Sequence, residues 1–498
     1  MKKITAISVF AFLVSMWSLS AQTYNIKDFK AMADGKTINT EAIQSAIDNC
    51  FEGGGGEVIV PPGVFYTGTI FLKSNVYLHL MPGAVLQGSY NPADYPEHNI
   101  LSHKKFGTIT HDGQWVKYMK ALVIADNVQN IGIIGQGTIK GAGEGDAFQL
   151  GLNKDGKPKN IFFVGCTNVK LKDITVLNSA QVTISISKCE KVFIDGLYVN
   201  SQVNWNCDGM DVDSKDVTIA NCIIESEDDA LCFKSEYLNT FCENITVTNC
   251  VVSSMCNGIK LGTGSRTGFR NITVNNCVIK RNLKNEYFHW EMTPDVVLDH
   301  KTTSVNTGIV IMTVDGGLME NISFSDIVMT DVLSPIFIRV GSRFLTPDNK
   351  PSVMRNISIS NVTAHTRSIL PSVIAGLQES PAHDIHLSNI SIYNHINVSP
   401  KMLKTFPVEV FEDLKTYPEN RLTFGLKIPA AAFYVRHVEG ITMNDILVTY
   451  GKEEARSAFY FDDTRNIRLR NVLVNNQKVG KNKALIGSKN SDKVEFEE

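Results

Sequence analysis

The sequence predicts an all-β fold built as one stack of parallel coils, a solenoid. Three observations predict it. One seven-residue pattern recurs from the middle of the 498-residue chain to its end, its most regular copies start 23 to 28 residues apart, and no helical periodicity fills the gaps. That step is too short for a strand, a helix and a second strand with ordinary loops, so successive copies are expected to stack as parallel strands.

The repeated pattern is Asn or Asp, apolar, any residue, apolar, any residue, Asn or Asp, apolar. Its alternation with period two predicts a strand with one face turned inward. With the variant KVFIDGL at 191, the first steps are 23, 25, 28 and 27 residues. The other copies are NVKLKDI at 168, DVTIANC at 216, NITVTNC at 244, NITVNNC at 271, NISFSDI at 321, NISISNV at 356, DIHLSNI at 384, GITMNDI at 440 and NIRLRNV at 466.

The Asn that opens a copy is expected at a corner of the chain. Asn tolerates a left-handed backbone and can hydrogen-bond to equivalent residues of neighbouring coils, so the N-I-T and N-I-S triplets are interpreted as turns rather than glycosylation sites. The cysteines fall into two columns, which predicts small buried side chains; disulfides between neighbours remain an alternative, and no spacing suggests zinc. One column is Cys222, Cys250 and Cys277, and the other is Cys166, Cys189 and Cys242.

One amphipathic helix is predicted at residues 41–48, EAIQSAID, directly before four glycines at 53–56. The glycines do not form a phosphate loop, because no Lys-Ser or Lys-Thr follows them and no strand precedes them. We expect the helix to cap the open N-terminal end of the solenoid, which would shield an edge that otherwise recruits other strands.

The N-terminal segment, residues 1–21, has two lysines, an apolar run and small residues near its end, and is predicted to be a secretory signal. We therefore expect export to the periplasm or the extracellular space, with residues 22–498 as one domain. A retained anchor is the alternative, although no other stretch has the apolar length to cross a bilayer. The net charge of −3, from 48 basic and 51 acidic residues, gives no reason to expect nucleic acid or a membrane as partner, and we expect a monomer.

Two segments, 281–305 and 395–429, interrupt the repeat and are rich in aromatic and charged residues. Such excursions either project from one face, where aromatic side chains would stack on sugar rings, or pack on the wall of the solenoid. The sequence leaves both interpretations open.

An acidic cluster appears when three successive coils are laid over one another: DGMDVDS from 208, DALCFKS from 229 and NGIKLGT from 257. Alternation sends the apolar residues inward and turns Asp211, Asp213, Cys232, Lys234 and Lys260 outward. The same superposition places Asp208, Asp229 and Asn257 in one column, with Asp228 beside Asp229. Neighbouring parallel strands lie about 4.7 to 4.9 Å apart, so these carboxylates are expected close together.

Crowded carboxylates resist simultaneous ionisation, so one of them is expected to keep its proton to a higher pH than a free Asp. An acid beside a base is what hydrolysis of a glycosidic bond requires. The alternative for Asp211 and Asp213 is that they form cross-strand ion pairs with Lys234 and Lys260. For Asp208, Asp228 and Asp229 we expect no basic partner.

The motif NCDGMD at 206–211, followed by EDDALCFKS from 227, resembles the N-x-D-G-x-D and D-D motifs of glycoside hydrolase family 28, the polygalacturonases and related pectin hydrolases. The resemblance implies a right-handed parallel β-helix and an inverting, metal-free hydrolase without cofactors. It makes Asp228 the general acid and Asp208 with Asp229 the groups that activate water, with the acid and base about 6.5 to 9.5 Å apart. The expected substrate-binding residues are Asn206, Asp211, Lys234, Asn257 and Lys260.

Two motifs depart from the family pattern. CNG at 256–258 puts Asn257 in place of the histidine of G-H-G, and GIVIMT at 308–313 puts Val310 and Met312 in place of the Arg and Lys of G-x-R-I-K-T. An apolar pair cannot form the charge-assisted hydrogen bonds that hold a uronate. Lys234, Lys260, Arg339 or Arg343 would then have to contact an acidic sugar.

The sequence therefore predicts a hydrolase of pectic poly- or oligosaccharides, with a rhamnogalacturonan or a rhamnoside as the substrate favoured by the altered motifs. Two alternatives stay open. One is a calcium-dependent pectic lyase that uses the same carboxylates as ligands. The other is a β-helix that binds carbohydrate without cleaving it.

Overall fold

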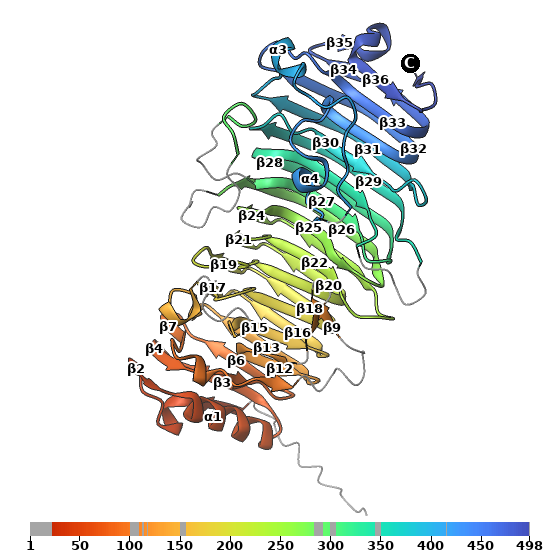
Figure 1. Ribbon diagram of the computed structural model, residues 1–498. Helices are drawn as coiled ribbons and strands as arrows, with labels where there is room; N and C mark the ends of the chain where they lie inside the picture. Colours follow the sequence, from red (N-terminus) through yellow and green to blue (C-terminus); the bar gives the residue numbers. More distant parts are fainter. Residues whose placement is uncertain are drawn as a thin grey trace, which may run out of the picture.

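The computed structural model describes residues 22–99, 109–111, 114–116, 118–149, 156–282, 292–298, 305–343, 350–414 and 416–497. The fold is all-β: parallel strands succeed one another along an elongated molecule, from the N-terminal coils at one end to the C-terminal coils at the other (Figure 1). Residues 1–21 and most of the excursion at 281–305 lie outside the described residues, so the predicted signal segment is not tested.

The strands form three rows, in which each strand pairs in parallel with the strand one coil further along. The row that carries the acidic cluster contains β5 (Ile70–Phe71), β12 (Ala121–Asp126), β15 (Lys159–Val164), β18 (Ile184–Asp195), β20 (Met210–Ala220), β22 (Leu231–Ser235), β25 (Asn257–Ser265), β27 (Val305–Thr313), β28 (Leu318–Val340), β30 (Ser372–Ala375), β32 (Ala430–Tyr450), β33 (Ser457–Arg470) and β36 (Ile486–Lys489). Long strands such as β18 and β28 turn a corner and continue in the next row.

The other two rows complete each coil. The second row consists of β1 (Gln22–Asn25), β3 (Gly56–Val60), β6 (Val76–Leu80), β13 (Gln129–Gly135), β16 (Thr167–Lys172), β23 (Cys242–Thr248), β26 (Gly268–Arg281), β29 (Val353–Thr366) and β31 (Ala382–Asn394), with parts of the long strands. The third consists of β2 (Asp34–Ile38), β4 (Gly63–Thr67), β7 (Ala84–Gly88), β14 (Thr138–Lys140), β17 (Thr175–Leu177), β19 (Tyr198–Ser201), β21 (Ile223–Ser226), β24 (Val251–Ser254) and β34 (Leu473–Val474). The seven-residue pattern therefore does form stacked parallel strands.

The core runs through the inside of the stack, and it is filled by the alternate residues of each strand. The pairs Met210 with Leu231 and Leu231 with Ile259 are in register, and all three side chains are fully buried in one continuous apolar cluster. The predicted alternation at these coils is confirmed. Burying aliphatic side chains at about 25 cal/mol per Å² of apolar surface is the main force that holds the coils together.

The Asn residues that open the repeats form the predicted ladder. Asn244, Asn271 and Asn321 all have φ of 56° to 57°, in the left-handed region. The amide of Asn271 donates to Asn244 at 3.1 Å and accepts from Asn321 at 3.0 Å, so each amide satisfies its neighbour on the next coil. The turn interpretation of these residues is confirmed.

The ten cysteines are all buried and all free. The column of Cys222, Cys250 and Cys277 lies in the core cluster, as does the column of Cys166, Cys189 and Cys242. Both columns therefore consist of buried thiols, and the alternative of disulfides between coils is not observed in the structure.

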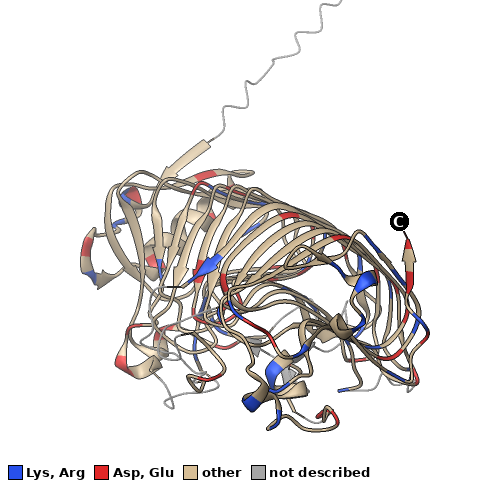
Figure 2. Cartoon of the chain, turned by 90° about the horizontal axis from the view of Figure 1, so that it is seen from above, with Lys and Arg blue, Asp and Glu red and all other residues tan. Residues whose placement is uncertain are grey.

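Helix α1 (Thr40–Glu52) contains the predicted amphipathic segment and buries Ile43, Ala46, Ile47 and Cys50. It lies at the N-terminal end of the stack (Figure 1). No helix in the described part of the chain combines the length and apolar composition needed to span a membrane. Acidic and basic residues are both distributed along the coils (Figure 2).

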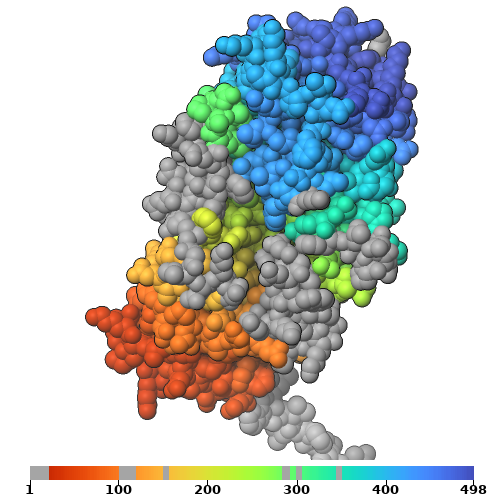
Figure 3. Space-filling model, viewed as in Figure 1, coloured from red at the N-terminus to blue at the C-terminus, as the bar shows by residue number. Residues whose placement is uncertain are grey.

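The excursion at 395–429 contains two short helices, α3 (Pro400–Leu403) and α4 (Asn420–Phe424). It packs on the outward side of the row that carries the acidic cluster: Phe424 contacts Phe337 and Tyr434, with ring centroids 6.3 and 6.0 Å apart. Packing on the wall therefore describes the part of this segment around Phe424, whereas Phe411 and Tyr417 are 74% and 40% exposed. Figure 3 shows the segment, in blue, bulging over one face of the molecule beside a hollow in the yellow-green coils.

Candidate active site

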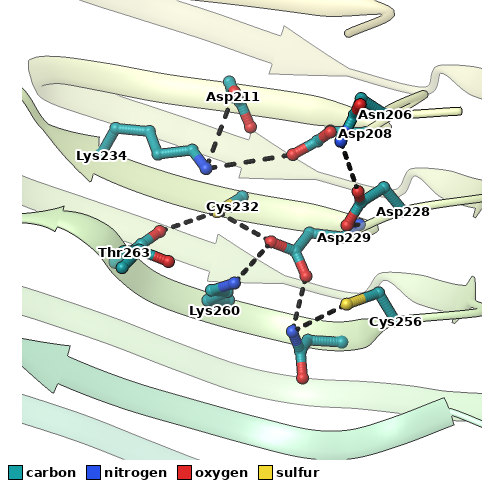
Figure 4. A network of polar contacts seen from close by, with 12 residues as sticks. Asn206, Asp208, Asp211, Asp228, Asp229, Cys232, Lys234, Cys256, Lys260 and Thr263 are labelled. Carbon is teal, nitrogen blue, oxygen red and sulfur yellow. Dashed lines mark hydrogen bonds and ion pairs between the residues drawn. The ribbon is translucent and has the colours of Figure 1, made fainter. Parts of the chain in front are cut away.

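The acidic cluster sits where β20, β22 and β25 begin. Asp208 and Asp228 to Asp229 lie in the turns that enter β20 and β22, and Asn257 is the first residue of β25. Register then aligns Asp211 with Cys232, and Cys232 with Lys260, on the outward side of the row. These residues form one polar network in the structure (Figure 4). The predicted superposition of the three coils is therefore correct.

The three aspartates lie close together. An oxygen of Asp229 is within 4.8 Å of an oxygen of Asp208, and likewise of an oxygen of Asp228. Both separations are shorter than the gap of about 6.5 to 9.5 Å that leaves room for a water between an inverting acid and base.

Asp229 is held as a carboxylate. Its oxygens accept from the ammonium of Lys260 at 2.9 Å and from the amide of Asn257 at 2.7 Å. Burial would raise the pKa of Asp229, but the charges of Lys260 and Lys234 and these hydrogen bonds outweigh burial and lower the pKa below its ordinary value.

Asp228 keeps its proton to a much higher pH than a free aspartic acid does. Burial, followed by the negative charges of Asp229 and Glu227, raises the pKa of Asp228 to about 7. Its oxygens accept only from neutral donors among the described residues, the amide of Asn206 at 3.2 Å and the backbone N–H of Asp229 at 2.8 Å. An acid and a base therefore stand side by side, as the crowding of carboxylates predicts.

Asp208 and Asp211 share Lys234, whose ammonium lies 3.9 Å from one oxygen of each. Burial, together with the charges of Asp211 and Asp228, raises the pKa of Asp208 well above its ordinary value. The pKa of Asp211 is also raised, mainly by burial, although Lys234 acts in the opposite direction. Asp229, whose pKa is lowered, is therefore more readily available as a carboxylate base than either residue of this pair.

The expectation that the three aspartates have no basic partner is wrong for two of them. Lys260 pairs with Asp229, and Lys234 lies 3.9 Å from Asp208, because alternation turns both lysines to the same outward side as the carboxylates. In the described part of the chain, Asp228 alone among the three has no lysine or arginine within 4.0 Å.

The expected cross-strand pairs are also only partly correct. Asp211 does lie near Lys234, but Asp213 pairs with Lys188 at 2.5 Å, and both of these side chains are buried. Lys188 belongs to the preceding coil and was not considered from the sequence. Asp213 thus belongs to a buried ion pair with Lys188 and is not part of the cluster of three aspartates.

Sequence reasoning missed Glu419. This residue lies in the excursion at 395–429, outside every copy of the repeated pattern. Its carboxylate accepts from Lys260 at 2.9 Å and from Asn257 at 3.2 Å, and its exposure is only 2%. The neighbouring Tyr417 hydrogen-bonds to Thr263 of β25 at 2.7 Å. The one available signal was the acidic and aromatic composition of the excursion, which does not give its position in space.

Val310 and Met312 do not line the cluster. Both are fully buried in a second apolar cluster, where the excursion covers the outward side of β27, β28, β30 and β32. Arg339 pairs with Glu412 of the same excursion, and Arg343 forms an ion pair with Asp315 at 3.0 Å. The arginines considered as contacts for an acidic sugar therefore already have carboxylate partners.

Two sets of side chains have the spacing of cation ligands: Asp208, Asp229 and Cys232, and Asp228, Asp229 and Cys256. Hard cations such as Ca²⁺ prefer six to eight oxygen ligands, and each set includes a thiol. Burial raises the pKa of Cys232 and of Cys256 well above the ordinary value, so both remain thiols rather than thiolate ligands. Lys260, 2.9 Å from Asp229, already supplies positive charge there. The residues present do not fit a calcium site.

Comparison with known proteins agrees with this geometry. Residues 100–286, which include all three aspartates, match the family model of Glycosyl hydrolases family 28. This part of the chain is therefore similar to glycosyl hydrolases family 28. An exo-poly-alpha-D-galacturonosidase of Dickeya chrysanthemi is 29% identical over 259 residues, which cover 42% of this chain and 41% of that protein.

Another relative is a probable polygalacturonase of Vitis vinifera, 29% identical over 226 residues, which cover 44% of this chain and 45% of the relative. The structure of a Yersinia enterocolitica family 28 exopolygalacturonase superposes with a TM-score of 0.66 at 21% identity and covers 90% of this chain and 78% of that one. The chain spans less than half the length of these two curated relatives, and the structural likeness shows a shared fold.

Proposed function

We propose that this protein is a glycoside hydrolase that cleaves pectic poly- or oligosaccharides with the aspartate cluster as its acid and base. The observation that carries the proposal is that two adjacent carboxyl groups have pKa values shifted in opposite directions. The pKa of Asp228 is raised to about 7, and the pKa of Asp229 is lowered. Two neighbouring titratable groups whose pKa values are shifted apart by their surroundings commonly act as an acid and a base.

In the proposed reaction Asp228 donates its proton to the oxygen of the departing sugar as the glycosidic C–O bond breaks. A water then attacks the anomeric carbon from the opposite side and loses a proton to a carboxylate, and the configuration inverts. Asp229, kept ionised by Lys260, is the better base on electrostatic grounds, while Asp208, with an oxygen within 4.8 Å of an oxygen of Asp229, would help to hold the water.

The excursion supports action at a chain end. Beyond β25, the outward side of the row is largely apolar and is covered by the excursion, with Phe424, Phe337 and Tyr434 packed together. Among the described residues, this packing obstructs a polysaccharide chain along those coils. The relatives named as exo-acting enzymes are consistent with this mode.

The same proposal includes the finer features of the fold and its location. The three parallel rows support a right-handed parallel β-helix, and the position of α1 at the first coils supports its role as a cap. Residues 1–21 are proposed as a secretory signal and 22–498 as a single monomeric catalytic domain. Cleavage near residue 21, read by N-terminal sequencing of exported protein, would test the signal.

The decisive experiment is the Asp228→Asn variant, assayed for reducing-sugar release on polygalacturonan, rhamnogalacturonan and their oligosaccharides. Loss of a general acid costs about 10² to 10⁴ in rate, so we expect at least a 100-fold fall with an unchanged circular dichroism spectrum. Asp216→Asn is the matched control: Asp216 is an exposed residue of β20 that accepts from Asn244 at 2.9 Å through an oxygen that Asn retains. Equal turnover by Asp228→Asn and the wild type would refute the assignment.

The same assay separates the alternatives. A calcium-dependent lyase would produce an unsaturated sugar that absorbs in the ultraviolet and would stop in EDTA. A binding protein without activity would retain pectic fragments and release no reducing ends. Products with inverted anomeric configuration, formed in the presence of EDTA, support the hydrolase.

A further inference from the structure

Glu419 places a carboxylate of the protein on the two groups of β25 best positioned to contact an acidic sugar. Its oxygens lie 2.9 Å from the Lys260 ammonium and 3.2 Å from the Asn257 amide. Asn257 also donates to Asp229 at 2.7 Å, so the contact lies directly beside the candidate base. Glu419 comes from the excursion, 159 residues after Lys260, and is almost completely buried.

The contact changes the charge that a substrate meets. Lys260 is held between the carboxylates of Asp229 and Glu419, and Lys234 lies between Asp208 and Asp211. An additional carboxylate brought next to these lysines would approach several negative groups in a buried site, where like charges repel more strongly than in water.

Most other cations along this side of the row also have carboxylate partners in the described residues. Lys159 of β15, near Asp211 and Asp208, is an exception, and donates instead to Ser185 at 3.1 Å. Lys188 is paired with Asp213, Arg339 with Glu412 and Arg343 with Asp315. Arg421 is near the site, but the charged side chain with the largest influence on its pKa is again Glu419. Val310 and Met312, at the positions where the family motif has Arg and Lys, are covered by the excursion.

We infer that the sugar residue cleaved by this site carries no carboxylate, and that Glu419 is the residue that sets this preference. The inference rests on the proposed glycosidase function and specifies its substrate: a neutral glycosyl residue of a pectic chain. Glu419 acts by accepting the hydrogen bonds of Lys260 and Asn257, which are then not available to a sugar carboxylate. It is therefore a positioning and specificity residue and takes no part in proton transfer.

The test uses aryl glycosides that differ in the sugar alone: 4-nitrophenyl α-D-galactopyranoside and α-L-rhamnopyranoside against 4-nitrophenyl α-D-galactopyranosiduronate. The galactoside and the galacturonide are identical except for CH₂OH or COO⁻ at C6. We expect the wild type to have a kcat/KM at least tenfold higher for a neutral glycoside than for the galacturonide. In Glu419→Gln the charge on Lys260 is less neutralised, so this ratio should fall at least tenfold.

The matched control is Glu409→Gln, which alters an exposed carboxylate of the same excursion, paired with Lys489 at 2.7 Å. It should leave the ratio unchanged. A wild type that prefers the galacturonide, or a folded Glu419→Gln variant with the wild-type ratio, overturns the inference. If Glu419→Gln does not fold, the wild-type ratio alone decides.

Calorimetric titration of the wild type with free galactose, rhamnose and galacturonate separates this inference from the proposed function. If no glycoside or pectic substrate is cleaved, the hydrolase proposal fails. Tighter binding of a neutral sugar than of galacturonate would then still support the specificity of the site, whereas equal binding, or binding of none of the three, would overturn it.

Discussion

At the scale of single residues, the acid–base character of the site comes from two neighbouring aspartates that have different hydrogen-bond and ion-pair partners. Asp228 and Asp229 are adjacent in the chain, yet the peptide between them turns so that Asp229 meets Lys260 and Asn257, while Asp228 meets the neutral amide of Asn206. A difference of one pKa unit corresponds to about 1.4 kcal/mol of differential interaction between the two protonation states. Small changes in these contacts should therefore change both activity and stability.

The first prediction is a loss of activity on the alkaline side. Asp228 must be protonated to act as the acid, and its pKa is raised to about 7, so kcat/KM should fall about tenfold for each pH unit above 7. Initial rates between pH 5 and 9 on the best substrate of the panel measure this. A rate that stays constant from pH 6 to 9 would mean that another group supplies the proton.

The second prediction concerns stability. Because the pKa of Asp228 is higher in the folded than in the unfolded chain, the folded state binds the extra proton between about pH 4 and pH 7, and stability falls as pH rises through this window. Asp228→Asn removes that penalty. Its free energy of unfolding should exceed that of the wild type by roughly 1 to 3 kcal/mol at pH 8 and by much less at pH 5.

Urea unfolding of Asp228→Asn and wild type at both pH values measures the difference. Asp216→Asn again serves as the control, because the exposed Asp216 should show no comparable gain. A variant that is no more stable than the wild type at pH 8 contradicts the assignment of a strained, protonated Asp228.

At the scale of the elements, the Asn ladder explains why the repeat begins with Asn. Asn271 satisfies two requirements at once: its φ of 56° is left-handed, and its amide bridges Asn244 and Asn321. Glycine meets the first requirement and not the second, and alanine meets neither.

The third prediction separates the two requirements. Asn271→Gly should lower the free energy of unfolding by about 1 kcal/mol, for the lost hydrogen bonds, and Asn271→Ala by about 1 to 2 kcal/mol more, for the strained backbone. Chemical unfolding of both variants measures the costs. Equal losses would show that backbone strain contributes nothing at this corner.

The fourth prediction follows from the cysteine columns. Titration of the unfolded protein with a thiol reagent should count ten free thiols with and without prior reductant, and dithiothreitol should leave the thermal midpoint unchanged. Fewer thiols before reduction than after it would show that cysteines of neighbouring coils form disulfides.

At the scale of the whole molecule, the excursion at 395–429 covers part of the outward side of the row that carries the acidic cluster. Phe424 anchors it on the apolar outward side of β28 and β32, whereas Leu414 of the same segment is 50% exposed. Removing a buried phenyl ring costs about 3 to 5 kcal/mol where the site cannot collapse, which is enough to loosen a segment without unfolding the parallel rows.

The fifth prediction is therefore that Phe424→Ala makes residues 395–429 sensitive to limited proteolysis, raises KM and adds longer oligosaccharides to the products. Leu414→Ala, the exposed control, should behave as the wild type. Product lengths by mass spectrometry and cleavage sites by N-terminal sequencing are the measurements. If Phe424→Ala released the same products as the wild type, the excursion would not determine the mode of action.

Sequence patterns alone were enough to predict the parallel stacking, the inward and outward faces of β20, β22 and β25, and the three clustered aspartates. These follow from short-range rules: alternation along a strand and a repeated step along the chain. The interpretation of Asn257 as a column partner of Asp229 was correct for the same reason.

Which charges at the site are neutralised could not be predicted without the packed structure. Lys260 meets Asp229 and Glu419, Asp213 meets Lys188, and Val310 is buried beneath a segment more than eighty residues further along the chain. Ion pairing depends on the distance and burial of groups from every element that packs at the site. A repeat pattern fixes the spacing within the coils, but it does not fix where a non-repeating excursion comes to rest.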